Sequence, residues 1–271
     1  MLARNFAKVT RMDFEHAKRV GIEAIYSGAR VLRDHFGHIS QINQKSAFDL
    51  VTEADTESEK QIIETIRKTF PDHAILAEES GANKGTAEYR WLIDPLDGTT
   101  NYVHQLPIFT IAIALALRDE IVLGLVLNPM DGELYSAIAG KGAELNGKSI
   151  KVSSTASVSD SLLITGFPYD FSEIVEPAMK RFSVCQQASQ GVRRLGSAAL
   201  DICYVACGRF DGFWEQHLKS WDKAAGAIIA AEAGAVITNF SSQPFSINQK
   251  EILVTNGRIH QEMLSLLELK D

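Results

Sequence analysis

Apolar residues near the start of the chain recur at the spacing of an amphipathic helix. Between residues 13 and 36 they return every three or four positions, and Gly37 follows as the expected stop. A second helix is predicted over residues 56–70, because Pro71 cannot continue it. The N-terminal part of the chain is therefore expected to contribute two helices.

Shorter apolar runs then predict strands. They cover residues 74–76, 91–93, 109–117, 121–127 and 133–137. Gly140-Lys-Gly142 and Asn146-Gly147 are turn sequences that separate short strands, as in a hairpin. This part of the chain is expected to form an antiparallel sheet.

From Ser161 onward, short strands alternate with helices. Strands are predicted at 162–165, 192–195, 210–214, 235–238 and 252–255, and helices at 173–188, 197–207, 221–233 and 259–267. The pattern predicts an α+β first half, residues 12–152, and an α/β second half, residues 153–271. Residues 1–11 hold three basic side chains and no acid, and are expected to be a flexible extension, with organelle targeting as the alternative.

Composition narrows the classes of function. The 271 residues are 45% apolar and 23% charged, and the formal net charge is −7. An acidic chain is not built to coat nucleic acid or an anionic membrane, and no apolar run has the length of a bilayer span. Three cysteines are too few for a disulfide framework, and Cys203 and Cys207 are predicted to pack as small core residues. We expect a cytoplasmic protein without direct nucleic-acid or membrane contacts.

The segment after the run at 91–93 carries the most informative chemistry. Asp94 and Asp97 flank Pro95, which we expect to end a strand, and Gly98 permits a tight turn with exposed backbone N–H groups. Such a turn can hold phosphate, and two acids facing one point call for a cation such as Mg²⁺ between them. The segment indicates a metal and phosphate site, although Asp-x-x-Asp before glycine also occurs in ordinary capped turns.

Acids at strand ends or helix starts occur in four separate segments, at residues 45–55, 77–81, 91–101 and 221–226. Taken singly, each is better explained as a cap or a surface acid. Together they supply carboxylates from distant positions, without a Ser-His-Asp or Cys-His signature. Phosphate monoesters hydrolyse extremely slowly, and metal ions can neutralise the phosphoryl group and activate water. The set therefore favours metal-dependent phosphate chemistry.

These motifs resemble those of the inositol monophosphatases, a family of metal-dependent, lithium-sensitive phosphatases. The resemblance runs over nearly the whole chain from Met12 and looks closest to the bacterial members of the extragenic-suppressor type. It is carried by Asp94-Pro-Leu-Asp97-Gly-Thr-Thr-Asn101, Gly166-Phe-Pro168, Arg194-Leu-Gly196-Ser-Ala-Ala-Leu-Asp201 and Trp221-Asp222-Lys-Ala-Ala-Gly226.

The resemblance implies roles for individual residues. Metal ions would be held by Glu78, Asp94, Asp97, Asp222 and the backbone carbonyl of Leu96. Glu78 and Thr99 would hold the attacking water, and Asp49 would orient Thr99. The substrate would be bound by Asp97, by the N–H groups of Gly98 and Thr99, and by Gly196, Ser197, Ala198, Glu215 and Asp222.

The resemblance also implies a fold, cofactors and partners. The fold would be a layered α/β/α/β/α sandwich of the sugar-phosphatase type, and the chain would form a homodimer. Each site would bind two or three Mg²⁺ ions, with Li⁺ inhibitory and Ca²⁺ or Mn²⁺ able to replace Mg²⁺ in binding. Inositol 1-phosphate would be the substrate, and RNA polymerase or a transcription factor would be the partner in a second, regulatory role.

The substrate stays open, and one other class of phosphatase is set aside. Lys219 stands three residues before Asp222, where animal members carry histidine, and His217 is out of register, so the substrate is less certain than the metal chemistry. Fructose bisphosphate, histidinol phosphate and 3′-phosphoadenosine phosphate are handled by relatives and are alternative substrates. An aspartate-nucleophile phosphatase of the haloacid dehalogenase type is rejected, because two residues rather than one separate Asp94 from Asp97.

Overall fold

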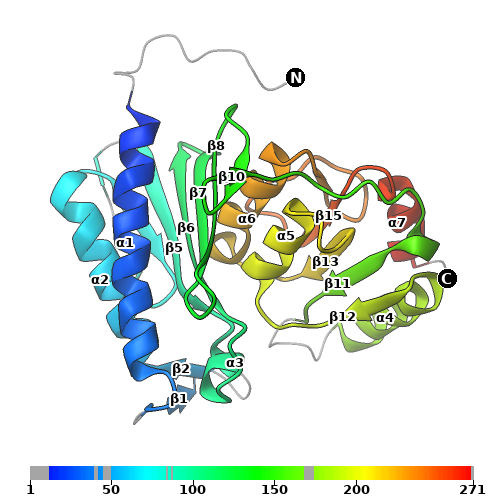
Figure 1. Ribbon diagram of the computed structural model, residues 1–271, viewed down its shortest axis with the longest axis horizontal. Helices are drawn as coiled ribbons and strands as arrows, with labels where there is room; N and C mark the ends of the chain where they lie inside the picture. Colours follow the sequence, from blue (N-terminus) through cyan, green and yellow to red (C-terminus); the bar gives the residue numbers. More distant parts are fainter. Residues whose placement is uncertain are drawn as a thin grey trace.

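Helices and sheets alternate in layers across the molecule, in the order helix, sheet, helix, sheet, helix (Figure 1). The structure is a computed structural model that describes residues 12–39, 42–44, 50–83, 85–86, 88–167 and 174–269. The layers confirm the predicted α+β sandwich. The predicted boundary near residue 153 stays a prediction, as does the extension at residues 1–11, which lies outside the described residues.

Among the described residues the first sheet has eight strands, in the order β10-β9-β8-β7-β6-β5-β3-β4. Neighbouring strands pair antiparallel, except that β3 runs parallel to β5. The strands are β3 (Ala74–Ala77), β4 (Gly81–Asn83), β5 (Tyr89–Asp97), β6 (Thr110–Leu117), β7 (Glu120–Asn128), β8 (Glu133–Ile138), β9 (Ala143–Leu145) and β10 (Lys148–Ser149).

The second sheet has five strands within the same described part, in the order β12-β11-β13-β15-β14. Strand β11 pairs parallel with both β12 and β13, whereas β15 pairs antiparallel with β13 and β14. The strands are β11 (Leu162–Thr165), β12 (Gly191–Arg193), β13 (Gly212–Gln216), β14 (Val236–Thr238) and β15 (Glu251–Thr255). A separate antiparallel pair joins β1 (Ile42–Gln44) to β2 (Leu50–Thr52).

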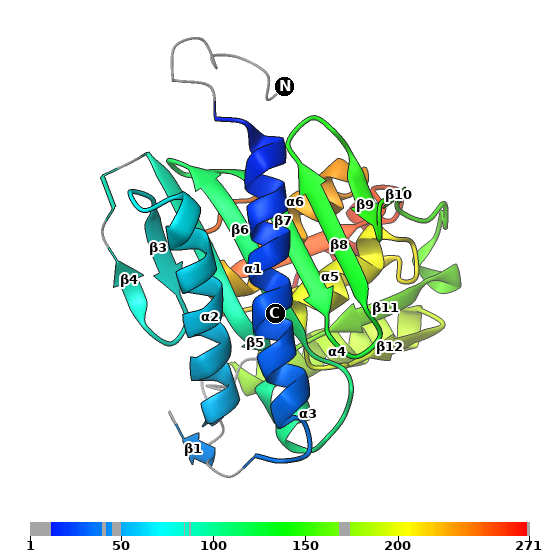
Figure 2. The same ribbon diagram turned by 60° about the vertical axis from the view of Figure 1, so that its left-hand side comes forward.

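Helices fill the other layers. They are α1 (Phe14–His35), α2 (Glu53–Thr69), α3 (Thr99–Val103), α4 (Val175–Ala188), α5 (Ala198–Ala206), α6 (Ser220–Glu232) and α7 (His260–Leu267), with a 3₁₀ turn at Val158–Asp160. Helices α1 and α2 lie side by side over the outer face of the first sheet (Figure 2). Helices α5 and α6 lie between the sheets, and α4 and α7 pack together beyond the second sheet.

Alternation along the central strand β6 explains the layers. Ile111, Ile113 and Leu115 pack with α1 and α2, and the alanines between them pack with α6 on the opposite face. Small side chains let α6 approach closely: a Cβ at Gly124 in β7 would lie 2.6 Å from the backbone oxygen of Ala225. The sheet is therefore covered on both faces.

Two sequence predictions about these elements are wrong in detail. Pro95 does not end a strand, because β5 continues to Asp97. The register shifts between Asp94 and Asp97, so Pro95 lies in a bulge where its missing N–H costs no ladder hydrogen bond. Helix α2 begins at Glu53 rather than at residue 56, because Thr52 and Asp55 form a capping box that starts it earlier.

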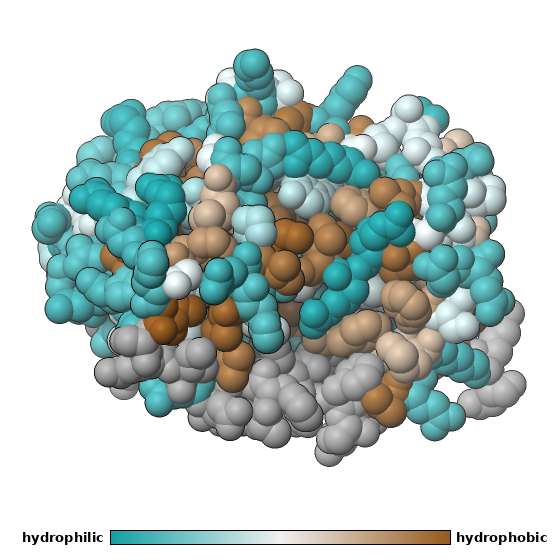
Figure 3. Space-filling view, turned by 60° about the horizontal axis from the view of Figure 1, so that its bottom comes forward, coloured by the Kyte–Doolittle hydropathy of each residue, from teal (hydrophilic) through white to brown (hydrophobic). Residues whose placement is uncertain are grey.

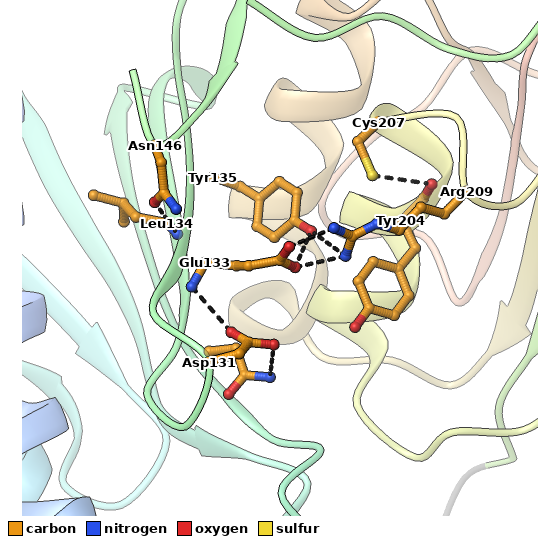
Figure 4. Close-up of polar contacts among 9 residues, drawn as sticks. Asp131, Glu133, Leu134, Tyr135, Asn146, Tyr204, Cys207 and Arg209 are labelled. Carbon is orange, nitrogen blue, oxygen red and sulfur yellow. Dashed lines mark hydrogen bonds and ion pairs between the residues drawn. The ribbon is translucent and has the colours of Figure 1, made fainter. Parts of the chain in front are cut away.

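A polar cluster joins the first sheet to the segment that follows α5 (Figure 4). The Arg209 guanidinium binds both oxygens of Glu133 in β8, and one of its nitrogens also donates to the Tyr135 hydroxyl at 3.1 Å. It also lies over the Tyr204 ring, 4.9 Å from the centroid. We call Arg209, Glu133, Tyr135 and Tyr204 the Arg209 cluster; it ties the two halves together.

The predictions drawn from composition concerned membrane-spanning segments and the role of the cysteines. Within the described residues, no helix combines the length and apolar character needed to cross a bilayer. Cys203 is buried and Cys207 half-buried, both as free thiols, as expected for core packing. The face that carries α3 is mostly hydrophilic, with hydrophobic side chains gathered near its centre (Figure 3).

Candidate active site

A pocket of about 490 Å³ lies where the two halves meet. The first half lines it with Glu78, Asp94, Leu96, Asp97, Gly98 and Thr99. The second half lines it with Gly166, Phe167, Arg194, Gly196, Ser197, Ala198, Asp201, Glu215, His217, Leu218, Lys219, Trp221 and Asp222. Every residue predicted for the site lines this one pocket except Asp49, which lies outside the described residues.

The bulge at the end of β5 turns its acids towards the pocket. Asp94 is 2% exposed, and one of its oxygens accepts the Leu96 N–H at 3.1 Å. Glu78 follows the parallel neighbour β3, and its N–H donates to the Ile93 carbonyl at 3.1 Å. Parallel strands end at the same edge of a sheet, which is why these acids meet.

Glu59 of α2 fixes the turn that carries Glu78. Its two carboxylate oxygens accept the N–H groups of Glu79 and Ser80, at 2.7 and 2.8 Å. Glu59 is itself 3% exposed. A buried carboxylate without these partners would be costly, so the turn and the carboxylate stabilise each other.

Gly98 makes the sharp turn into α3. Its φ is 104°, and a Cβ there would lie 3.1 Å from the Gly196 carbonyl oxygen and 3.2 Å from that of Ile108. Both the backbone conformation and the lack of space require glycine. The turn brings the backbone of Gly98 and Thr99 to the pocket, where their N–H groups could meet an anion.

Thr99 is held from both sides. Its hydroxyl lies 3.2 Å from an Asp55 oxygen and 3.2 Å from the Leu96 carbonyl oxygen. The other Asp55 oxygen accepts the N–H and the hydroxyl of Thr52, at 2.9 and 2.6 Å. Within the described residues, the carboxylate that contacts Thr99 is therefore Asp55; the predicted role of Asp49 stays a prediction.

Asp97 joins the two halves at the pocket floor. One of its oxygens accepts the Ser197 hydroxyl and the Ala199 N–H, both at 2.7 Å, at the start of α5. These bonds favour the charged form, and a carboxylate at a helix N-terminus is stabilised further. The N-terminus of α5 is thereby fixed against the end of β5.

Three acids of the pocket, Asp94, Asp97 and Asp222, have raised pKa values. Burial raises the pKa of Asp94, and the charges of Glu78, Asp97 and Asp222 raise it further. Burial raises the pKa of Asp97 to about 6 against the effect of its hydrogen bonds, and burial with the charge of Asp97 raises the pKa of Asp222 to about 8. Such a cluster gains free energy from a cation.

The donor set fits a hard divalent cation, since it offers carboxylate oxygens and a backbone carbonyl and no thiol. Among the residues that the structure describes, no three His, Cys, Asp or Glu side chains stand in an arrangement that could hold a metal ion. Burial is the main cause that raises the pKa of Asp94, and the neighbouring Glu78 carboxyl raises it further. The clustered carboxylates and the Leu96 carbonyl nevertheless supply the oxygen donors that a hard divalent cation prefers.

The opposite wall of the pocket comes from the second half. Glu215, near the end of β13, is 6% exposed, and burial is the main cause that raises its pKa. It packs so closely on Gly166 that a Cβ there would lie 2.2 Å from a Glu215 oxygen. Burial is also the main cause that raises the pKa of Asp201, and the charge of the exposed Arg194 only partly offsets the rise at Glu215 and Asp201. This wall offers acceptors for hydroxyl groups.

Asp222 and Lys219 lie at the first turn of α6. An Asp222 oxygen accepts the Lys219 N–H at 2.7 Å, which closes the turn. Lys219 lines the pocket and is exposed, and His217 also lines the pocket although it is out of register in the sequence. Both residues therefore contribute to the wall.

Sequence reasoning missed three features of the site. Asp55 lay within an acidic segment that was singled out, yet no role was assigned to it. Asp201 lines the pocket and is 1% exposed, and neither of its oxygens has a hydrogen-bond partner among the described residues. Lys223 stands beside Asp222, and its buried amine could not be recognised from the sequence.

Comparisons with known proteins agree with this geometry. The sequence profile of the inositol monophosphatase family matches residues 13–269. The chain is 43% identical to an inositol-1-monophosphatase of Synechocystis, in an alignment that covers 94% of this chain and 90% of that protein. It is 38% identical to the Nus factor SuhB of Pseudomonas aeruginosa, in an alignment that covers 85% of this chain and 87% of that protein. The structure superposes on the extragenic suppressor protein suhB of Bartonella henselae with a TM-score of 0.91 and 34% identity, covering 94% of this chain and 100% of that one.

Proposed function

Because this chain belongs to the inositol monophosphatase family and is a phosphatase, we propose that it hydrolyses inositol 1-phosphate in a Mg²⁺-dependent reaction. The observation that carries the proposal is the meeting of Glu78, Asp94, Asp97 and Asp222 in one pocket. Burial and the charges of neighbouring acids raise the pKa values of Asp94, Asp97 and Asp222, and a cation beside them would favour their charged forms.

The same four carboxylates, with the Leu96 carbonyl, would hold the metal. When bound, Mg²⁺ would neutralise charge on the phosphoryl group and lower the pKa of a bound water.

The protein's own residues position the reactants. Glu78 and the Thr99 hydroxyl would hold the attacking water. Asp55 accepts a hydrogen bond from the Thr99 hydroxyl and so fixes its position. The N–H groups of Gly98 and Thr99 would bind phosphate oxygens, so the phosphoryl group would lie against the end of β5. This arrangement needs no nucleophilic side chain.

The alcohol half of the substrate would lie against the second wall. Gly196, Ser197, Ala198 and Glu215 form its floor and side, and Glu215 supplies a buried acceptor for a hydroxyl group. The polar wall favours a polyol ester over an apolar one. Other sugar or nucleotide phosphates would use the same mechanism and differ in contacts to this wall.

Phosphate release by wild-type protein and by Asp94→Asn tests the proposal. With Mg²⁺ we expect release by the wild type, and loss of activity in Asp94→Asn and in EDTA. Asp131→Asn, which changes an acid in the turn between β7 and β8, is the matched control and should keep activity. A wild-type rate in a folded Asp94→Asn protein would contradict the metal assignment.

A partner in transcription is a second candidate function, favoured by the relative that is named a Nus factor. The acidic balance of the chain suits a protein partner rather than nucleic acid. Pull-down with RNA polymerase is the test, and failure to recover it would remove this role. Inhibition by Li⁺, a homodimer and a cytoplasmic location also stay predictions.

A further inference from the structure

Lys223 is a buried cation that the proposed reaction does not use. It lies in the first turn of α6 and is 1% exposed. Its Nζ donates to the backbone carbonyl of Leu218 at 3.2 Å and to that of Gln249. The side chain therefore connects two backbone segments rather than reaching solvent.

Those segments lie on either side of Lys223. Residues 217–219 form part of the pocket wall, and we call them the rim segment. Residues 246–250 precede β15, and we call them the anchor turn. The His217 N–H also donates to the Lys250 carbonyl at 2.6 Å, so the rim segment is bonded to the anchor turn directly as well as through Lys223.

The anchor turn is itself held by internal hydrogen bonds. The Gln249 N–H donates to the Ser246 carbonyl at 3.1 Å, and the Gln249 side-chain oxygen accepts the Ser246 N–H at 3.1 Å. It can therefore serve as a fixed support. The rim segment needs one, because His217 has a φ of 65°, which a non-glycine residue adopts only where its surroundings impose it.

Burying the Lys223 ammonium group is energetically unfavourable compared with filling the same space with an apolar side chain. Taking a charge out of water is unfavourable, and a well-packed apolar side chain of similar volume is often at least as stabilising. Two carbonyl oxygens offset part of that cost. The position of Lys223 is thus better explained by what its hydrogen bonds hold than by packing.

We propose that Lys223 is a positioning residue that fixes the rim segment as the wall for the alcohol half of the substrate, and so helps to select among phosphate esters. This inference rests on the proposed phosphatase function. The phosphate half would be bound by the opposite wall, at Gly98 and Thr99. Loss of the Lys223 hydrogen bonds should therefore weaken recognition of the alcohol and leave recognition of phosphate in place.

Lys223→Met keeps the length of the side chain and removes its donors. We expect the KM for inositol 1-phosphate to rise on the order of tenfold, with kcat within about threefold of wild type. Inhibition by inorganic phosphate should be unchanged, and the preference for inositol 1-phosphate over 2-glycerophosphate should narrow. Lys223→Gln, which keeps a shorter donor, should lie between Lys223→Met and wild type.

Thr238→Val is the matched control, because it removes a buried hydrogen bond in the same half, to His260, outside the pocket lining. It should lower stability without changing KM. Equal losses for both esters in Lys223→Met, or an altered phosphate inhibition constant, would overturn the proposal and point to an effect through Asp222.

Amide hydrogen exchange tests the positioning without activity. Exchange in the rim segment and the anchor turn should quicken in Lys223→Met and stay at the wild-type rate in Thr238→Val. Unchanged exchange in both segments would overturn the positioning role. If wild-type protein released no phosphate from any ester while exchange changed as expected, the proposed function would fail and the positioning role would stand. Lys223→Gln supplies the same comparison where Lys223→Met does not fold.

Discussion

The Thr99 hydroxyl donates a hydrogen bond of 3.2 Å to the Asp55 carboxylate, 44 positions earlier in the chain. Through its other oxygen, Asp55 also caps the start of α2 at Thr52. One buried carboxylate thus links a helix outside the first sheet to the turn where the phosphate would bind. The position of the Thr99 hydroxyl is set before any substrate arrives.

Thr99→Ala should lower kcat by about a hundredfold and change KM much less, because it removes an orienting contact to the water. Thr99→Ser keeps the hydroxyl and is the matched control, with activity near wild type. Steady-state kinetics on inositol 1-phosphate check both. A change confined to KM would remove the role proposed for Thr99.

Metal-free protein should become less stable as pH rises. The folded-state pKa values of Asp97, about 6, and Asp222, about 8, lie above the ordinary value of 3.8. The protons retained by the folded state stabilise it fully below about pH 4, and this contribution is lost as pH rises through 6 and 8. Mg²⁺ should therefore raise the melting temperature more at pH 8 than at pH 6. Equal shifts at the two pH values, by differential scanning fluorimetry, would contradict this.

Asp201→Asn should stabilise the protein by about 1–3 kcal/mol at pH 8, because the buried Asp201 carboxylate has no hydrogen-bond partner in the part of the chain that the structure describes. Burial raises the pKa of Asp201, so the gain should shrink as pH falls and the carboxyl becomes protonated. Asp211→Asn is the control with the opposite expected result. The Asp211 carboxylate accepts hydrogen bonds from the Ser153 hydroxyl and the Leu162 N–H, so replacing it should destabilise the protein. Urea unfolding measures both. Destabilisation by Asp201→Asn would show that the carboxylate has a stabilising partner.

The Arg209 cluster should contribute modestly to stability. Arg209 and Glu133 are bidentate but partly exposed, with side chains 43% and 19% accessible, so screening keeps their coupling to about 1 kcal/mol. A double-mutant cycle with Glu133→Gln and Arg209→Met measures that coupling. Because the cluster lies outside the pocket lining, kcat should not change; a loss of activity at unchanged stability would mean that it also shapes the site.

Long periodic stretches allowed the longer helices and most strands to be predicted, whereas the five-residue helix α3 was missed. Strands β1, β2 and β4 were missed, because three residues are too few to show a period. Pro95 misled the prediction for β5, since only pairing with β6 reveals that a bulge accommodates it. Local sequence carries no information about which partner strand will be present.

The acids of the site were predictable because they stand in motifs at strand ends and helix starts. Asp201 ends the quoted motif that begins at Arg194, but it was given no role, because in sequence it is an acidic residue in an apolar helix and only the packing of α5 brings it to the pocket. Lys223 was hidden for a similar reason: its two acceptors, Leu218 and Gln249, are backbone carbonyls that any residue supplies.

Metal-dependent hydrolysis at this pocket is tested most directly by phosphate release from inositol 1-phosphate, fructose bisphosphate, histidinol phosphate and 3′-phosphoadenosine phosphate, with Mg²⁺ and with EDTA. We expect metal-dependent release, fastest from inositol 1-phosphate. Metal-dependent release led by another ester would keep the mechanism and contradict the substrate. Equal release in EDTA, or none from any ester by folded and metal-loaded protein, would contradict metal-dependent hydrolysis at this pocket.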